Sequence, residues 1–182
     1  MKRKVALLCG LLSGAAGFNA CAVDGVSLAL GKAGRGDDVD FARIGLQWNW
    51  QEKWFTGGNW FIGGYWEAGI GLWSGDSPAG GNKDVVEVGL TPVFRLQQKT
   101  LSAVAPYVEG GIGVHLLSDR RIHAVKDMGS DYHFGSLLGL GARFGSRGRF
   151  DLSYRLQHFS NAGIKKPNPG IDFHQIRLQY HF

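Results

Sequence analysis

Apolar side chains recur at every second position through most of this chain, and that alternation restricts it to a small set of folds. Side chains two residues apart point to the same side of a β-strand, so each alternating segment predicts a strand with one apolar face. Turn-forming residues separate the segments at regular intervals. The predicted strands cover 25–32, 41–50, 59–73, 85–96, 103–116, 132–144, 149–160 and 171–182. We therefore expect an all-β domain of eight strands.

The apolar face falls on the even-numbered positions of the predicted strands, as in Ile44, Ile70, Val88, Val114 and Leu138. The opposite face carries glycines and the ionisable residues Arg43, Glu67, Glu87, Arg95, Glu109, Arg143, Arg155 and Arg177. A soluble barrel or sandwich would turn such charges toward water and its apolar face toward a core. A closed barrel in lipid does the reverse and can pair arginine with glutamate in its interior. The pattern favours an eight-stranded antiparallel transmembrane β-barrel, with a soluble β-sandwich as the alternative.

The first 22 residues have the pattern of a secretory signal peptide. Basic residues at positions 2–4 precede a short apolar stretch, and Ala20 and Ala22 supply small side chains at the cleavage positions. We expect cleavage before Val23, which leaves 182 − 22 = 160 residues. This size suits one barrel domain over residues 23–182.

Removal of the signal segment changes two bulk properties of the chain. Cys9 and Cys21 both leave with it, so the mature chain has no thiol for a disulfide or for nucleophilic attack. Loss of the three basic residues at positions 2–4 lowers the formal net charge from +5 to +2, so we do not interpret the basic balance as nucleic-acid binding. No run in the mature chain approaches the ~18 apolar residues of a spanning helix.

The last residues carry an apolar series at two-residue spacing, Ile176, Leu178, Tyr180 and Phe182, which resembles the C-terminal assembly signal of bacterial outer-membrane proteins. Export and an even number of strands place both termini in the periplasm. The connections 33–40, 74–84, 117–131 and 161–170 would then be outer loops, and 51–58, 97–102 and 145–148 periplasmic turns. Pro92 and Pro106 are expected at bulges or strand ends, because proline removes a ladder donor.

His158, Ser160 and Asp172 continue the apolar, lipid-facing side of the last two predicted strands. Serine becomes nucleophilic when an imidazole takes its proton, and a carboxylate fixes the tautomer of that imidazole. An even register places Asp172 opposite either His158 or Ser160, whereas a shift by one residue would turn it inward. These residues predict an esterase that acts on membrane lipid, with Asn161 and the Gly163 backbone as donors to the oxyanion.

The stretch Arg155-Leu156-Gln157-His158-Phe159-Ser160-Asn161-Ala162-Gly163-Ile164, followed by Pro167-Asn168-Pro169-Gly170, resembles the motif of the lipid A 3-O-deacylases, the PagL family. The resemblance extends over the mature chain and is densest in 154–182. It implies an outer-membrane barrel enzyme that hydrolyses the ester-linked acyl chain at position 3 of lipid A. It also implies that this enzyme acts on lipopolysaccharide and needs no metal or other cofactor.

The same resemblance implies a role for each residue of the site. His158 would be the general base, Ser160 the nucleophile, and Asn161 with the Gly163 backbone the oxyanion hole. The acidic member falls on Asp172, where the best-known members carry glutamate. The shorter aspartate must come nearer the imidazole or act through a slightly shifted loop.

Basic side chains gather in the predicted outer loops, at Arg120, Arg121, Lys126, Lys165 and Lys166. They suit pairing with lipid A phosphates, and the alternative is that they are solvated loop charges. The other histidines, His115, His123, His133, His174 and His181, have no metal-ligand spacing, and we expect His174 to support the site from its edge. The acidic residues Asp76, Asp119, Asp127 and Asp131 form no calcium loop. We expect no metal and no nucleic-acid partner, and a homodimer is left open.

Two other functions are compatible with the sequence. A non-catalytic barrel could serve adhesion, envelope stability or small-molecule passage, and it predicts no consequence from Ser160→Ala. A different membrane esterase or acyltransferase could use the same residues on phospholipids. Analysis of lipid A after expression of the wild type and of Ser160→Ala separates the three functions.

Overall fold

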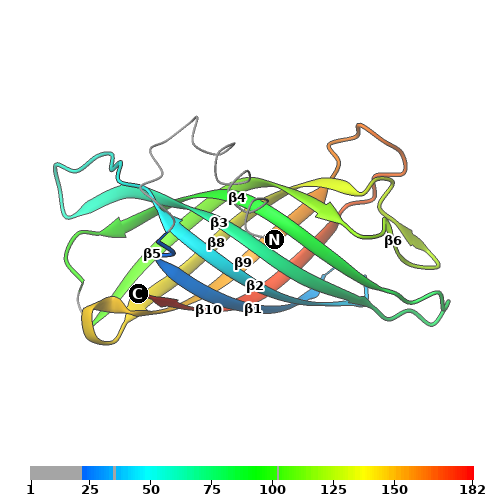
Figure 1. Cartoon of the computed structure of the whole chain (residues 1–182), viewed down its shortest axis with the longest axis horizontal. Helices are drawn as coiled ribbons and strands as arrows, with labels where there is room; N and C mark the ends of the chain where they lie inside the picture. Colours follow the sequence, from blue (N-terminus) through cyan, green and yellow to red (C-terminus); the bar gives the residue numbers. More distant parts are fainter. Residues whose placement is uncertain (1–21, 35, 102) are drawn as a thin grey trace, which may run out of the picture.

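The computed structural model describes residues 22–34, 36–101 and 103–182 and consists of one closed antiparallel barrel. The barrel strands are β1 (Gly25–Ala33), β2 (Val39–Asn49), β3 (Trp60–Gly75), β4 (Asp84–Gln98), β5 (Val104–Leu117), β8 (Tyr132–Phe144), β9 (Phe150–Ser160) and β10 (Ile171–His181). They follow chain order around the barrel, and β1 pairs with β10 to close it (Figure 1). The eight-stranded barrel expected from the alternation is therefore confirmed.

The connections differ between the two ends of the barrel. We call the end with connections 34–38, 76–83, 118–131 and 161–170 the long-loop end; the opposite end has connections 50–59, 99–103 and 145–149. The longest connection holds a small hairpin of β6 (Arg121–His123) and β7 (Lys126–Asp127), which the sequence pattern did not predict. A 3-10 turn at Ser146–Gly148 lies in a connection at the opposite end. No helix in the described part of the chain has the length and apolar character to cross a membrane.

The predicted signal segment falls almost wholly on residues 1–21, which lie outside the described residues. The two prolines within strands behave differently. Pro106 lies near the start of β5, where the pairing with β4 has ended, as expected for a strand end. Pro92 lies in the middle of β4 opposite Trp66, and the register with β5 is the same on both sides of it, so the expected bulge is wrong there. The hydrogen-bond ladder between β4 and β5 is interrupted at Pro92, but the register of the two strands does not shift. Proline removes a backbone donor and inserts no extra residue.

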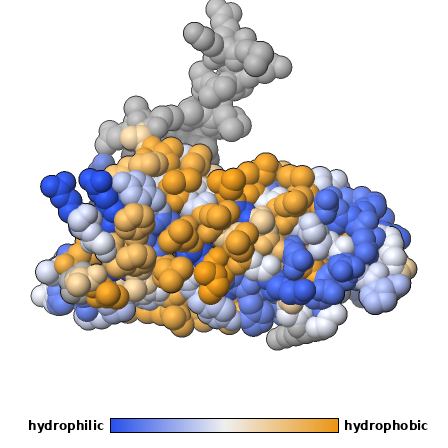
Figure 2. All heavy atoms as spheres, turned by 90° about the horizontal axis from the view of Figure 1, so that it is seen from below, coloured by the Kyte–Doolittle hydropathy of each residue, from blue (hydrophilic) through white to orange (hydrophobic). Residues whose placement is uncertain are grey.

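The outer surface of the barrel is apolar. Large even-numbered side chains are widely exposed along the strands, among them Ile44 (55%), Val88 (53%) and Leu138 (64%). Figure 2 shows these apolar residues gathered over the middle of the molecule, while hydrophilic residues cover the long-loop end. An exposed band of this kind is the surface that hydrocarbon covers in a membrane barrel. A soluble β-sandwich, the alternative to a membrane barrel, would bury this face.

The interior is filled by charged side chains that neutralise one another. Arg43, Arg95, Arg155 and Arg177 face Glu67, Glu87, Glu109 and Asp151, all of them buried. The pairs are Arg43–Glu87, Arg95–Glu109, Arg95–Asp151, Arg155–Glu67, Arg155–Glu109 and Arg177–Glu67, with N···O distances of 2.7–3.0 Å. Arg143 differs from this expected pattern, because it lies near the opposite end and donates to the Gly148 carbonyl at 3.0 Å.

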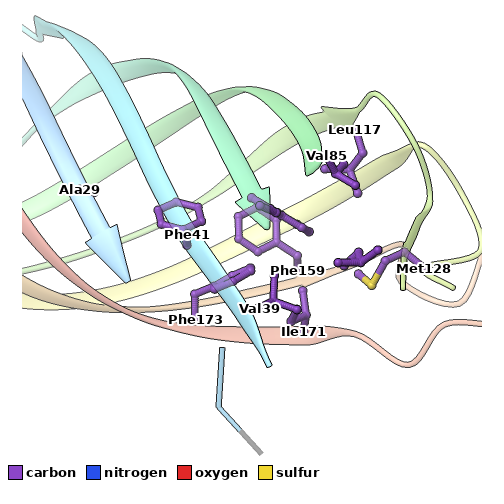
Figure 3. Packing of buried hydrophobic residues seen from close by; sticks show 11 residues of the cluster. Ala29, Val39, Phe41, Val85, Leu117, Met128, Phe159, Ile171 and Phe173 are labelled. Carbon is purple, nitrogen blue, oxygen red and sulfur yellow. The ribbon is translucent and has the colours of Figure 1, made fainter. Parts of the chain in front are cut away.

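A buried apolar cluster closes the interior at the long-loop end (Figure 3). Phe41, Phe159 and Phe173 point inward from three strands. The Phe173 ring contacts Phe41 in a tilted arrangement at 5.0 Å and Phe159 edge to face at 5.9 Å between ring centroids. Ile122 and Met128 of the longest connection cover them and are fully buried. This cluster gives the ends of β9 and β10 a packed support from inside the barrel.

We expect Arg155→Leu to lower the free energy of unfolding by roughly 3–5 kcal/mol, because it leaves Glu67 and Glu109 short of a buried partner. Urea unfolding in detergent or lipid measures this change. Arg149→Leu is the matched control, since the Arg149 side chain is exposed and bonds the Tyr180 hydroxyl, and we expect a cost of about 1 kcal/mol. Equal losses in the two variants would contradict a role for the buried network.

Candidate active site

His158 and Asp172 form a hydrogen-bonded pair on the outside of the barrel. His158 Nδ1 lies 2.6 Å from Asp172 Oδ1, and the two side chains are 46% and 28% exposed. They are direct cross-strand partners on β9 and β10. Of the two registers open to the sequence, the structure has the one that places Asp172 opposite His158. The short side chain of Asp172 therefore reaches the imidazole directly.

Gly170 leaves space for the imidazole of His158, because it has no Cβ. Its φ is +65°, and a Cβ added there would lie 2.7 Å from His158 Cε1 and 3.3 Å from Nε2. The β9–β10 register, extended by one pair beyond Ile171–Phe159, puts Gly170 beside Ser160. The Nε2 edge of the ring therefore points toward the long-loop end, where Ser160 lies.

Two serines lie near His158 on the same outer face. Ser160 is two residues further along β9, and Ser136 is the direct cross-strand neighbour of His158 on β8. Sequence reasoning missed Ser136, because only the β8–β9 register reveals the contact. Asp172 binds Nδ1 on the β10 side, and Nε2 lies near the position that a Cβ of residue 170 would occupy, so the free nitrogen faces away from Ser136 on β8. This orientation favours Ser160 as the hydroxyl that His158 would activate.

Asn161 shapes the loop that follows Ser160. Its side chain is fully buried, and its amide nitrogen donates to the carbonyls of Met128 (3.3 Å) and Lys165 (3.0 Å). Its backbone N–H donates to the side chain of Asn168 at 3.0 Å. Both donors are thus engaged in this state, and the predicted oxyanion role of Asn161 stays a prediction. Gly163 is exposed at φ +77°, a backbone conformation that favours glycine, and an added Cβ would meet no atom within 4 Å.

Comparison with known proteins agrees with this geometry. A model of the lipid A 3-O-deacylase (PagL) family matches residues 40–181. Lipid A deacylase PagL of Pseudomonas aeruginosa is 32% identical over 151 residues, covering 83% of this chain and 82% of the relative. Lipid A deacylase PagL of Bordetella bronchiseptica is 45% identical over 76 residues, covering 42% of this chain and 41% of the relative.

The crystal structure of the outer membrane enzyme PagL is similar with a TM-score of 0.75 and 28% identity, covering 87% of this chain and 99% of that one. The chain belongs to the lipid A 3-O-deacylase (PagL) family. It is accordingly a carboxylic ester hydrolase and a protein of the bacterial outer membrane. The lipid-facing position of the His158–Asp172 pair fits an enzyme of this family, because its ester lies in the membrane.

The basic residues predicted to bind lipid A phosphates lie in different surroundings in this deacylase. Lys165 and Lys166 are exposed in the loop beside Ser160. Arg120 and Arg121 are exposed but share Asp127, at 3.7 and 3.5 Å. Lys126 is buried and pairs with Asp37 at 2.8 Å, which ties the longest connection to the β1–β2 connection. The two lysines are therefore the cations most available to a ligand at the site.

Other polar residues of the deacylase have structural partners. Lys83 bonds Asp119 at 2.6 Å and holds the pKa of that carboxyl below its usual value. His174 lies on the outer face next to Asp172 and contacts the Tyr154 hydroxyl at 2.5 Å. Within the described residues, no group of three or more histidines, cysteines or acidic residues is arranged to hold a metal ion.

We expect Gly170→Ala to lower the deacylation rate by on the order of 10²-fold, since its Cβ would push the His158 ring out of line with Ser160. Gly80→Ala is the matched control, because Gly80 has a similar φ of +75° but no atom within 4 Å of a Cβ. Rates are compared at equal amounts of folded protein in the membrane. A similar rate in the two variants would rule out the contact as a determinant of ring position.

Proposed function

We propose that this chain hydrolyses the ester at position 3 of lipid A with a Ser160–His158–Asp172 triad that faces the lipid of the outer leaflet. The observation that carries the proposal is the hydrogen bond between His158 and Asp172 on the apolar exterior. Ser160 lies two residues further along the same outer face of β9. A histidine and a carboxylate at the edge of hydrocarbon are costly unless they serve a function. The family match supplies the substrate.

The first half-reaction transfers the acyl chain to the enzyme. Asp172 accepts a hydrogen bond from the Nδ1–H of neutral His158. This leaves Nε2 free to accept the proton of Ser160. Ser160 Oγ attacks the ester carbonyl and forms a tetrahedral oxyanion. When this collapses, the bond to the 3-oxygen of lipid A breaks, and His158 donates its proton to that oxygen. The products are 3-hydroxy lipid A and an acyl ester on Ser160.

The second half-reaction returns the enzyme to its starting state. Water gives a proton to His158 Nε2 and attacks the acyl carbonyl, and collapse releases a fatty acid while the proton returns to Ser160. Asp172 stabilises the imidazolium in both halves. The backbone N–H of Gly163 would donate to the oxyanion, and Asn161 would join by releasing Asn168 or its loop carbonyls.

The orientation of the barrel follows from the same proposal. The long-loop end would lie at the cell surface, because outer-membrane barrels carry long loops outside and short turns in the periplasm. His158, Ser160 and Asp172 then meet the outer leaflet, and residues 1–22 act as the signal that directs export. Lys165 and Lys166 lie beside Ser160, where they can pair with the phosphates of lipid A.

Ser160→Ala and His158→Ala should each abolish release of the 3-linked acyl chain and leave a folded, heat-modifiable barrel, since both residues lie on its exterior. Mass spectrometry of lipid A from expressing cells measures the loss. Ser74→Ala is the control, because Ser74 faces outward on β3 and bonds Asp84, away from His158.

A serine-directed fluorophosphonate should label Ser160 and not Ser136. Activity within tenfold of wild type in Ser160→Ala would falsify the triad, and release of phospholipid acyl chains alone would favour the phospholipid esterase.

Asp172→Asn should retain substrate binding but lose on the order of 10²–10⁴-fold in rate, because the amide favours the wrong tautomer of His158. Asp172→Glu should stay within about tenfold of wild type, since the connection 161–170 can absorb one methylene. Deacylation rates at matched membrane levels test both. If the Asn variant equals the wild type, the enzyme works as a Ser–His dyad.

A further inference from the structure

His158 belongs to a row of directly paired residues on neighbouring strands, and this row crosses the outer face of the barrel at an angle to the barrel axis. Asp172 lies one residue inside the end of β10 and His158 two residues inside the end of β9. Ser136 lies four residues inside β8, and Ile112 five residues inside β5. The row therefore descends from the long-loop end toward the middle of the membrane as it passes from β10 to β5. Ser136 is deeper in the lipid than either His158 or Ser160.

Ser136 lies below Ser160 on the path into the membrane. The two are diagonal neighbours on β8 and β9, roughly 7–8 Å apart. Barrel strands tilt by about 35–45°, which brings this diagonal close to the membrane normal. An acyl chain held at Ser160 and extending into the bilayer must therefore pass Ser136. The exposed side chains of Ile112 (65%) and Leu138 (64%) flank it.

The Ser136 hydroxyl is available to a ligand. It is exposed and has no hydrogen-bond partner within the described residues. Three other hydroxyls on the outer face are bonded: Ser74 to Asp84, Tyr154 to His174 and Tyr180 to Arg149. A hydroxyl that faces hydrocarbon without a partner gains from any polar group the lipid brings to it.

We propose that Ser136 is a specificity-determining residue that hydrogen-bonds a hydroxyl on the third carbon of the acyl chain being removed. This rests on the proposed deacylase function. With the carbonyl carbon at Ser160, a group two carbons further along the chain enters the space between the two serines. A chain without that hydroxyl leaves Ser136 unpaired, so the enzyme prefers 3-hydroxyacyl over unsubstituted acyl esters.

The test uses the full chain in mixed micelles and two synthetic lipid A analogues that differ only in the hydroxyl of the 3-linked chain. Ser136→Ala should lower the ratio of kcat/KM values, hydroxylated over plain, by about fivefold, the effect of one neutral hydrogen bond. Ser136→Thr keeps a hydroxyl and should keep the ratio. Ser136→Leu should slow both substrates by blocking the path, whereas Ala42→Leu, an enlargement on the outer face of β2, should slow neither.

Each outcome bears on one proposal. If wild type cleaves neither analogue, the deacylase function fails. If wild type cleaves both and Ser136→Ala leaves the ratio unchanged, the function stands and the role of Ser136 is overturned. An equal loss on both analogues in Ser136→Ala also overturns it, because that result assigns Ser136 to general support of the site.

Discussion

The need to satisfy every backbone N–H and C=O within lipid determines the rest of this structure. Only a closed ladder does so with strands, and β1 completes it by pairing with β10. Closure gives each strand one face toward lipid and one toward a narrow interior. The charged side chains of that interior are buried, so arginines and carboxylates must pair, as Arg155 does with Glu67 and Glu109.

The same ladder builds the site. Because side chains alternate with a period of two, an even register keeps His158 and Asp172 on one face, and a slip by one residue would place one of them among the interior charges. The observed register makes them direct partners, 2.6 Å apart. The phenylalanines next to them in sequence, Phe159 and Phe173, point inward and pack together, so the interior cluster supports the register of the His158–Asp172 pair from inside the barrel.

The fold and the central pair could be predicted from the sequence because both depend on parity, which the sequence displays directly. Features that depend on the exact strand register or on the path of the loops could not be predicted from the sequence. The sequence does not reveal that Ser136 borders His158, that Gly170 limits the ring, or that Lys126 is buried against Asp37. Asn161 has the odd parity of an inward residue, and its burial follows from that signal, which the interpretation of it as an oxyanion donor did not use.

The wall of the barrel separates the buried ion pairs from the proposed site. The buried ion pairs are inside, whereas the residues of the proposed triad and Ser136 are on the outer face. Substitutions on the outer face therefore change the local environment of a lipid without removing a buried partner. A change of hydroxyl or carboxylate on the outer face, such as Asp172→Glu, therefore leaves the interior network and the strand register that it supports in place.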